Sequence, residues 1–263
     1  MRGEPPTSDT LEDQRNRPSE PTSMFIRSRF VSLLFAVVLV VPVVAVSSAV
    51  GAVAAASGLP ACSYRDVITA ARGYSLYSHT LLDTIHMVPR TYAPGDLRST
   101  GVAGGGQLRS VAIGDLRGMF AAARRAGAAL MIKSSYRSYA TQVSTFNYWV
   151  RVEGYRKALL TSARPGHSEH QLGTAVDVTS YGGKAPWLYS DWGTTKAGAW
   201  MRTNAWTFGF VMSYPNGKSP SVTCYKYEPW HFRYVGKATA KAIHASGLTP
   251  REWIWQHPTG FPT

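Results

Sequence analysis

The sequence predicts a single α+β domain in which a small antiparallel sheet is flanked by helices. Short apolar segments typical of strands are interspersed with segments of helical periodicity, and long loops hold most of the polar residues. This alternation of short strands and helices favours an antiparallel sheet over a doubly wound parallel one. The chain has 263 residues, of which 44% are hydrophobic, so it can bury a substantial core. No internal repeat follows Ala56.

Helices are predicted where apolar residues recur at helical spacing between residues that start and stop a helix. In the clearest case Asp115 serves as the N-cap, Leu116 and Met119 lie on one face, and Gly127 ends the helix. The predicted helices are 115–127, 139–150, 195–206 and 237–246, and a mixed helical pattern covers 62–82.

Strands are predicted where short apolar or alternating runs lie between turn residues. The expected strands are 128–133, 174–179, 208–212 and 227–235. Residues 92–96 (YAPGD) indicate a turn, and the glycines of 102–107 (VAGGGQ) indicate a flexible loop.

The first 56 residues differ from the rest in composition. Residues 1–23 are rich in Pro, Ser, Glu and Arg and hold few large apolar residues, which predicts a disordered extension. Residues 24–56 place Arg27 and Arg29 before a long uncharged run that ends in alanines, which indicates a targeting segment and not a buried core helix. A cleaved signal peptide and a retained membrane anchor both fit, and Met24 is a second candidate start. Both readings predict export of residues 57–263, since the cations stay on the cytoplasmic side.

The formal net charge is +13, and all of this surplus lies after residue 56, as 23 basic against 10 acidic residues. A basic domain favours polyanionic partners such as nucleic acid, anionic lipid or anionic polymers. Export and the scattered placement of the basic residues argue against nucleic acid.

Two cysteines, Cys62 and Cys224, lie near the two ends of the expected domain. Outside the cytoplasm they can form a disulfide, which would stabilise the fold by roughly several kcal/mol in the chain-entropy model. Two buried thiols and soft metal ligands are the alternatives, and export favours the disulfide.

Three short stretches carry residues suited to catalysis. In the first, 168–177 (SEHQLGTAVD), His170 lies in a polar loop and Asp177 lies inside an apolar strand. A charge in such a strand is costly unless it is paired or bound to a metal, and imidazole with carboxylate is a zinc donor set. Gly173 would allow a tight turn between the two donors.

In the second stretch, 228–231 (EPWH), Pro229 must kink the chain if Glu228 and His231 are to face one cavity. In the third, 135–138 (SYRS), Arg137 follows a buried strand and can offer a planar pair of donors to a carboxylate or an oxyanion. Each stretch alone is more often structural than catalytic.

Together these stretches resemble the VanY-type D-alanyl-D-alanine carboxypeptidases, zinc peptidases related to the VanX dipeptidases. The resemblance covers about residues 80–250, in order and in spacing. The family pattern Ser-x-His-x(2)-Gly-x-Ala-x-Asp is met by Ser168, His170, Gly173, Ala175 and Asp177. The Glu-x-x-His element is met by Glu228 and His231. The upstream Ser-x-Tyr-Arg-Ser element is met by Ser134, Tyr136, Arg137 and Ser138.

The resemblance implies one zinc ion in a cleft on the sheet, bound by His170, Asp177 and His231. It implies that Glu228 is the general base and that Arg137 stabilises the oxyanion or positions the substrate. Ser168 and Tyr136 are expected to help bind the substrate.

Other polar residues near these motifs are predicted to lie outside the site. His167 is expected to be a loop residue or a support for the site, and Glu169 is expected to point to solvent. Four further histidines match no motif and are expected at the surface or in the core: His79, His86, His244 and His257.

The resemblance implies that residues 57–263 form a zinc D,D-carboxypeptidase domain that acts on peptidoglycan stem peptides. L,D-carboxypeptidase or endopeptidase activity on the same fold is the alternative, with the choice set by the loops 97–108 and 182–195. A non-catalytic wall-binding protein is the alternative of another class. We expect a monomer, contact with anionic wall polymers, and contact with membrane only through the N-terminal segment.

Overall fold

The computed structural model describes residues 58–69 and 74–257, all in the unit that spans Val53–Thr263. The predicted extension 1–23 and targeting segment 24–56 lie outside the described residues. Among those described, no helix combines the length and the apolar character that crossing a membrane requires.

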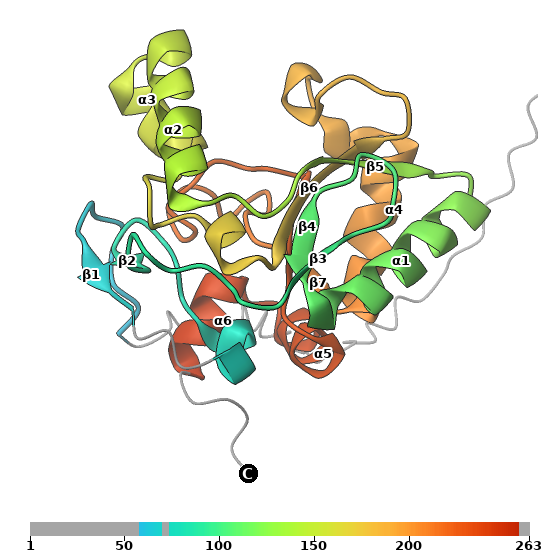
Figure 1. Cartoon of the computed structure of the whole chain (residues 1–263), viewed down its shortest axis with the longest axis horizontal. Coiled ribbons are helices and arrows are strands. Elements are labelled where there is room, and N and C mark those ends of the chain that lie inside the picture. The colour runs from blue at the N-terminus through green and yellow to red at the C-terminus, as the bar shows by residue number, and fades with distance from the viewer. Residues whose placement is uncertain (1–57, 70–73, 258–263) are drawn as a thin grey trace, which may run out of the picture. The chain divides into compact units, whose positions relative to one another are not determined.

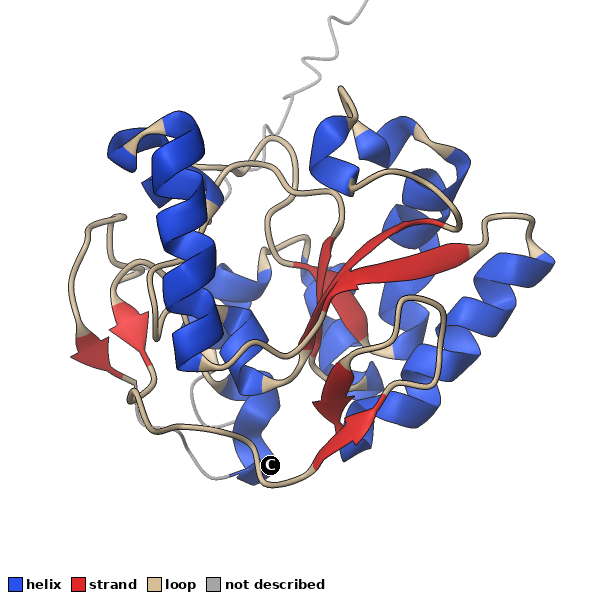
Figure 2. Cartoon of the chain, turned by 45° about the horizontal axis from the view of Figure 1, so that its top comes forward, coloured by secondary structure: helices blue, strands red, loops and turns tan. Residues whose placement is uncertain are grey.

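A four-stranded antiparallel sheet forms the centre of the domain, as predicted (Figure 2). Its strand order is β5-β6-β8-β7. The strands are β5 (Leu130–Ser134), β6 (Ala175–Ser180), β7 (Phe210–Met212) and β8 (His231–Tyr234). Two small sheets pair β1 (Val67–Ile68) with β2 (His86–Met87) and β3 (Leu97–Ser99) with β4 (Gln107–Arg109).

Helices lie on both sides of this sheet, with α1 and α4 on one side and α2 on the other (Figures 1 and 2). The α-helices are α1 (Ser110–Arg125), α2 (Tyr139–Glu153), α3 (Tyr155–Thr161), α4 (Lys196–Asn204), α5 (Lys237–Ser246) and α6 (Pro250–Gln256). The 3-10 helices are η1 (Tyr74–His79), η2 (Glu169–Leu172), η3 (Pro186–Leu188), η4 (Trp192–Thr194) and η5 (Ala205–Phe208).

Three predicted elements need correction. The strand expected over 227–235 is confined to β8, His231–Tyr234, because a turn closed by the His231 amide and the Glu228 carbonyl precedes it. The helix expected from Asp115 begins at Ser110, so Asp115 lies within α1 and is not its N-cap. Its carboxylate instead accepts a hydrogen bond from the Tyr234 hydroxyl at 2.8 Å and pairs with Lys237 at 2.6 Å. The helical pattern expected over 62–82 yields only η1 among the described residues.

The hydrophobic core occupies one face of β6 and β8 and leaves the other face available for polar side chains. Val176 and Val178 of β6 and Phe232 and Tyr234 of β8 pack into one core cluster with apolar residues of α1 and α4, including Leu116. Because successive side chains of a strand point to opposite faces, the residues between them face away from this core. The positions of the apolar residues therefore determine which residues of β6 and β8 lie on the opposite, polar face of the sheet.

The segment before β2 is fastened to the domain by covalent and polar contacts. A disulfide joins Cys62 to Cys224, which confirms the predicted pairing across 162 residues of sequence. Nearby, the Nε of buried Arg251 donates to Asp83 Oδ2 at 2.7 Å. His86 Nδ1 lies 2.9 Å from the other carboxylate oxygen of Asp83.

The Asp83 contacts predict a specific dependence of stability on pH. Burial raises the pKa of Asp83, but the hydrogen bonds of His86 and the charge of Arg251 outweigh it and hold the pKa well below its usual 3.8. A carboxyl with a depressed folded-state pKa stabilises the fold fully above its unfolded pKa and loses that contribution as the pH falls. Asp83→Asn should therefore cost about 3–5 kcal/mol at neutral pH, because Arg251 is left unpaired.

Urea unfolding of Asp83→Asn and the parent protein at several pH values checks this. The difference between the two should shrink below about pH 4, by about 1.4 kcal/mol per pH unit for one proton. An equal difference at pH 6 and pH 2 would contradict the assigned role of the carboxylate.

Candidate metal centre and active site

The register of the sheet brings two of the predicted zinc ligands together. Asp177 of β6 and His231 of β8 are directly opposed Cα partners, and both point away from the core that holds Val176 and Phe232. Asp177 Oδ1 lies 3.0 Å from His231 Nδ1. Strand alternation, which the core residues enforce, thus places a carboxylate and an imidazole side by side.

The third ligand arrives on the short helix η2. Ser168 caps η2 and accepts a hydrogen bond from the His170 amide at 3.3 Å. Gly173 ends η2 in the left-handed region with φ +70°, where a Cβ would also come within 2.9 Å of Leu97. Only glycine adopts this conformation without strain. The turn at Gly173 connects η2 to β6 and so places His170 beside Asp177 of β6.

The three predicted ligands converge as the sequence implied. The ligand atoms of His170, Asp177 and His231 all lie within 4.8 Å of one another, and all three side chains are buried. His170 Nε2 lies 3.2 Å from Asp177 Oδ2.

The hydrogen bonds of His170 show that this cluster suits a cation. Its Nδ1 lies 2.6 Å from the Ser135 carbonyl oxygen, which can only accept, so Nδ1 carries a proton. Burial, together with the charge of Arg137, lowers the pKa of His170 to about 4 against the opposing effect of Asp177, so the ring is neutral at pH 7. Its buried Nε2 then presents a lone pair without a hydrogen-bond partner toward the Asp177 carboxylate. Two sets of electron pairs that face each other repel unless a cation lies between them.

The donor set fits zinc. Two imidazole nitrogens and one carboxylate oxygen are the ligands of many catalytic zinc sites, which keep a further position open for water or substrate. The described residues fit the metal that the sequence resemblance implied.

Glu228 lies beside the cluster and outside it. The His231 amide donates to the Glu228 carbonyl at 3.1 Å, which closes the turn that Pro229 was expected to impose. Glu228 Oε2 is 3.9 Å from His231 Nδ1. Burial, with the charges of Asp177 and Glu169, raises the pKa of Glu228 to about 8 against the opposing charges of His231 and Arg137. A carboxyl poised near neutral pH can both take up and release a proton.

Arg137 lies where its charge reaches the same groups. Its amide donates to the His170 carbonyl at 3.2 Å, and its buried Nε has no hydrogen-bond partner among the described residues. Burial lowers the pKa of Arg137, and the charges of Asp177 and Glu228 counteract this shift. The Arg137 guanidinium has an unused hydrogen-bond donor, which could bind an anionic group of a substrate.

The other two predicted substrate residues, Tyr136 and Ser168, each lie next to a residue of the site in sequence or contact one directly. Tyr136 is partly exposed, and its amide donates to the Gln107 carbonyl at 2.9 Å. Ser168 is buried, and its hydroxyl oxygen caps η2. Their contact with substrate stays a prediction.

The prediction that Glu169 points to solvent is wrong. Glu169 is 5% exposed, and its Oε2 lies 2.9 Å from His231 Nε2 and 2.6 Å from Ser213 Oγ. Arg233 Nη1 donates to its Oε1 at 2.9 Å. The sequence held one signal for this arrangement: Arg233 lies two residues after His231 on β8, so it shares the face of the sheet that carries the metal ligands, where a buried arginine requires an anion.

The remaining histidines hold no place in the metal cluster. His167 is buried, with Nδ1 2.8 Å from the Asp83 carbonyl and Nε2 3.0 Å from Asp66, so it supports the fold near the site. Within the described residues, the group that could hold a metal excludes the four histidines without a motif: His79, His86, His244 and His257.

Comparison with known proteins identifies the family. The family model described as "VanY: D-alanyl-D-alanine carboxypeptidase" matches residues 105–237, half of the chain. The "Putative carboxypeptidase YodJ" of Bacillus subtilis is 38% identical over 181 residues, 66% of each chain. A D-alanyl-D-alanine carboxypeptidase of Enterococcus faecalis is 34% identical over 148 residues, 53% of this chain and 52% of its own. The chain thus spans about two thirds and about half of these relatives.

Solved structures share the fold. The LdcB LD-carboxypeptidase is 36% identical, with a TM-score of 0.61 over 68% of this chain and 87% of its own. The vancomycin resistance D,D-pentapeptidase VanY of a VanB-type cassette, solved with Zn(II), is 28% identical, with a TM-score of 0.58 over 68% of this chain and 99% of its own. The family model spans the His170, Asp177 and His231 cluster together with Arg137 and Glu228. The chain therefore belongs to the VanY family of D-alanyl-D-alanine carboxypeptidases.

Proposed function

We propose that this chain is a zinc-dependent carboxypeptidase that releases the terminal D-Ala from peptidoglycan stem peptides. The observation that carries the proposal is the convergence of His170, Asp177 and His231, with Glu228 beside them but outside the ligand set. That separation supplies three metal donors and an independent proton acceptor, which hydrolysis of a peptide bond requires.

In the proposed mechanism each residue has one task. Zinc, when bound, polarises the scissile carbonyl and makes water more acidic. The Glu228 carboxylate takes the proton of the attacking water and then donates it to the departing amine, so that the acid–base balance closes over one turnover. Arg137 donates to the oxygen on which negative charge develops, or to the carboxylate of the substrate.

Two segments beside the site support the expectation that loops select the scissile bond. Trp187, within 182–195, contacts Trp230 edge to face at 6.4 Å between ring centroids, and Trp230 precedes His231. Gln107, at the end of 97–108, bonds through its amide to Ser135 Oγ at 3.0 Å. Both segments thus reach residues adjacent to the metal cluster or to Arg137.

L,D-carboxypeptidase activity is the second candidate. The LdcB LD-carboxypeptidase shares 36% identity with this chain, against 28% for the D,D-pentapeptidase VanY. The same metal donors and proton acceptor would serve either bond, so substrate length distinguishes them.

The test uses the purified chain with zinc, with and without chelator, on a muramyl pentapeptide ending in D-Ala-D-Ala and on the tetrapeptide. Mass spectrometry should show chelator-sensitive loss of one alanine from the pentapeptide. Loss from the tetrapeptide alone would replace the proposal by the L,D activity. Cleavage of neither substrate by zinc-loaded protein would contradict both and favour an endopeptidase or a wall-binding protein.

We further propose that residues 57–263 act outside the cytoplasm. The targeting features of 24–56 and the Cys62–Cys224 disulfide support export, since such bonds persist in oxidising compartments. The +13 net charge suits anionic wall polymers. Fractionation of expressing cells tests this, and recovery of the protein in the cytoplasm alone would contradict it.

A further inference from the structure

One buried carboxylate touches the metal cluster without a task in the reaction proposed above. Glu169 is the first residue of η2, directly before the ligand His170, yet its side chain reaches the other imidazole ligand, His231. Its Oε2 lies 2.9 Å from His231 Nε2, the ring nitrogen on the side away from Asp177. Glu169 therefore contacts Nε2, the ring nitrogen of His231 that a metal ion bound at Nδ1 would leave uncoordinated.

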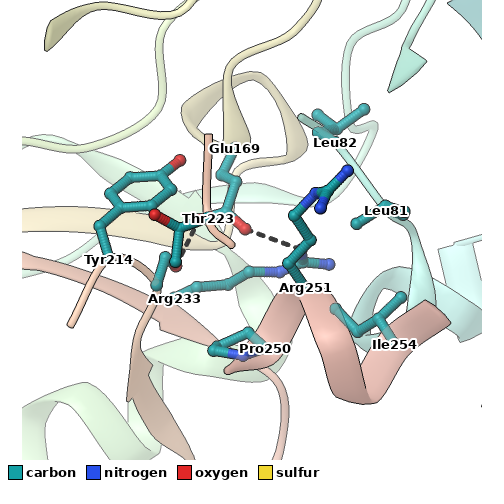
Figure 3. A pocket seen from close by; sticks show the side chains of 10 residues that line it. Leu81, Leu82, Glu169, Tyr214, Thr223, Arg233, Pro250, Arg251 and Ile254 are labelled. Carbon is teal, nitrogen blue, oxygen red and sulfur yellow. Dashed lines mark hydrogen bonds and ion pairs between the residues drawn. The ribbon is translucent and has the colours of Figure 1, made fainter. Parts of the chain in front are cut away.

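The Glu169 carboxylate is itself held from two further directions. Arg233 Nη1 donates to Oε1 at 2.9 Å, and Ser213 Oγ donates to Oε2 at 2.6 Å. Figure 3 shows the Glu169 carboxylate directed at the Arg233 guanidinium, on the wall of a small cavity of about 10 Å³. With its partners in place, the carboxylate has little freedom to turn.

Arg233 is anchored in turn to the backbone of a distant segment. It is fully buried, and its Nη2 donates to the carbonyl oxygens of Tyr77 and Thr80 at 2.8 and 2.7 Å. A continuous chain of contacts runs from these carbonyls through Arg233 and Glu169 to His231. Because the arginine neutralises the glutamate, the pair avoids the cost of an isolated buried charge.

The chemical consequence lies in the choice of tautomer. A neutral imidazole carries one N–H, and both ring nitrogens of His231 face a carboxylate, Nδ1 facing Asp177 and Nε2 facing Glu169. With a metal ion between Nδ1 and Asp177, the Glu169 carboxylate would keep the N–H on Nε2 and leave the Nδ1 lone pair for the ion. Nδ1 is the nitrogen that faces Asp177 and the cluster. A carboxylate bonded to the far nitrogen also orients the ring and increases its basicity as a ligand.

We propose that Glu169, held by Arg233 and Ser213, is a positioning residue that fixes His231 with Nδ1 directed at the metal ion. The inference rests on the proposed function only in that the cluster takes zinc. It would stand for a D,D- or an L,D-carboxypeptidase alike.

A purely structural ion pair is the competing explanation, and the domain contains a matched control for it. Asp83 and Arg251 form a second buried carboxylate–arginine pair, at 2.7 Å, that contacts none of the three metal ligands through its side chains. A variant of that pair should lower stability without a change in zinc affinity.

The experiment measures zinc affinity by competition with a chromophoric chelator at one pH, together with the visible spectrum of the Co(II) form. Glu169→Gln should raise the zinc Kd by about 10–100-fold and shift the Co(II) bands. Ser213→Ala should give a smaller change in the same direction. Asp83→Asn should leave the Kd within about twofold and the Co(II) bands in place.

Because Glu169→Gln leaves a buried arginine unpaired, the double variant Glu169→Gln/Arg233→Gln removes both charges and guards against misfolding. It should show the same loss of zinc affinity as the single variant. A parental zinc Kd in both variants, or an equal loss in Asp83→Asn, would overturn the proposal. A parent protein that binds zinc but cleaves no stem peptide would sink the proposed function alone.

Discussion

Glu228→Ala should reduce the kcat for release of D-Ala by about 10²–10⁴-fold while the protein keeps its zinc. The carboxylate lies 3.9 Å from His231 Nδ1 and is not part of the converging donor set, so its removal spares the ligands. Its loss leaves the attacking water without a proton acceptor and the departing amine without a proton donor. Zinc content and kcat are measured on the same preparation, by elemental analysis and by steady-state assay.

Two companion variants show whether the loss is chemical. Glu228→Gln keeps the volume and removes proton transfer, so it should be as inactive as the alanine variant. Glu153→Gln changes a glutamate at the end of α2, away from the cluster, and should keep parental kcat. A Glu228→Gln enzyme within threefold of the parent would remove Glu228 from the mechanism.

The site could be predicted from the sequence because its geometry follows from strand alternation. Val176 and Val178 mark the core face of β6, so Asp177 must face the other way, and Phe232 does the same for His231 on β8. Helix α5, from Lys237 to Ser246, was predicted to the residue because its apolar periodicity is local. Where local pattern and tertiary packing agree, prediction succeeds.

Prediction failed where long-range contacts decide the structure. Asp115 looked like an N-cap, but its partners Tyr234 and Lys237 lie far along the chain and hold it within α1. Glu169 lies in a polar stretch of sequence, and its buried contacts are with distant residues: Ser213, His231 and Arg233, all more than 40 residues away. No periodicity encodes such pairings, so a single sequence does not reveal them.

Removal of zinc should abolish activity and also lower the melting temperature. The Glu228 carboxylate lies beside Asp177 and His231, and the lone pair of His170 faces Asp177 Oδ2 at 3.2 Å. A cation at the centre offsets this repulsion, so zinc should bind the folded chain far better than the unfolded one. Free zinc at 1,000 times its Kd would stabilise the fold by about 4 kcal/mol, or roughly 8–16 °C in Tm for a domain of this size.

The matched control is His170→Ala, which removes one ligand without leaving a charge unpaired. Its Tm should be insensitive to chelator, because a site with two ligands holds zinc weakly. Calorimetric scans with and without chelator, on both proteins, separate the stabilising effect of the metal from any effect of the chelator itself. A parent protein with equal Tm and full activity after verified loss of zinc would contradict the metal centre, because the repulsion around Asp177 would then need another source of compensation.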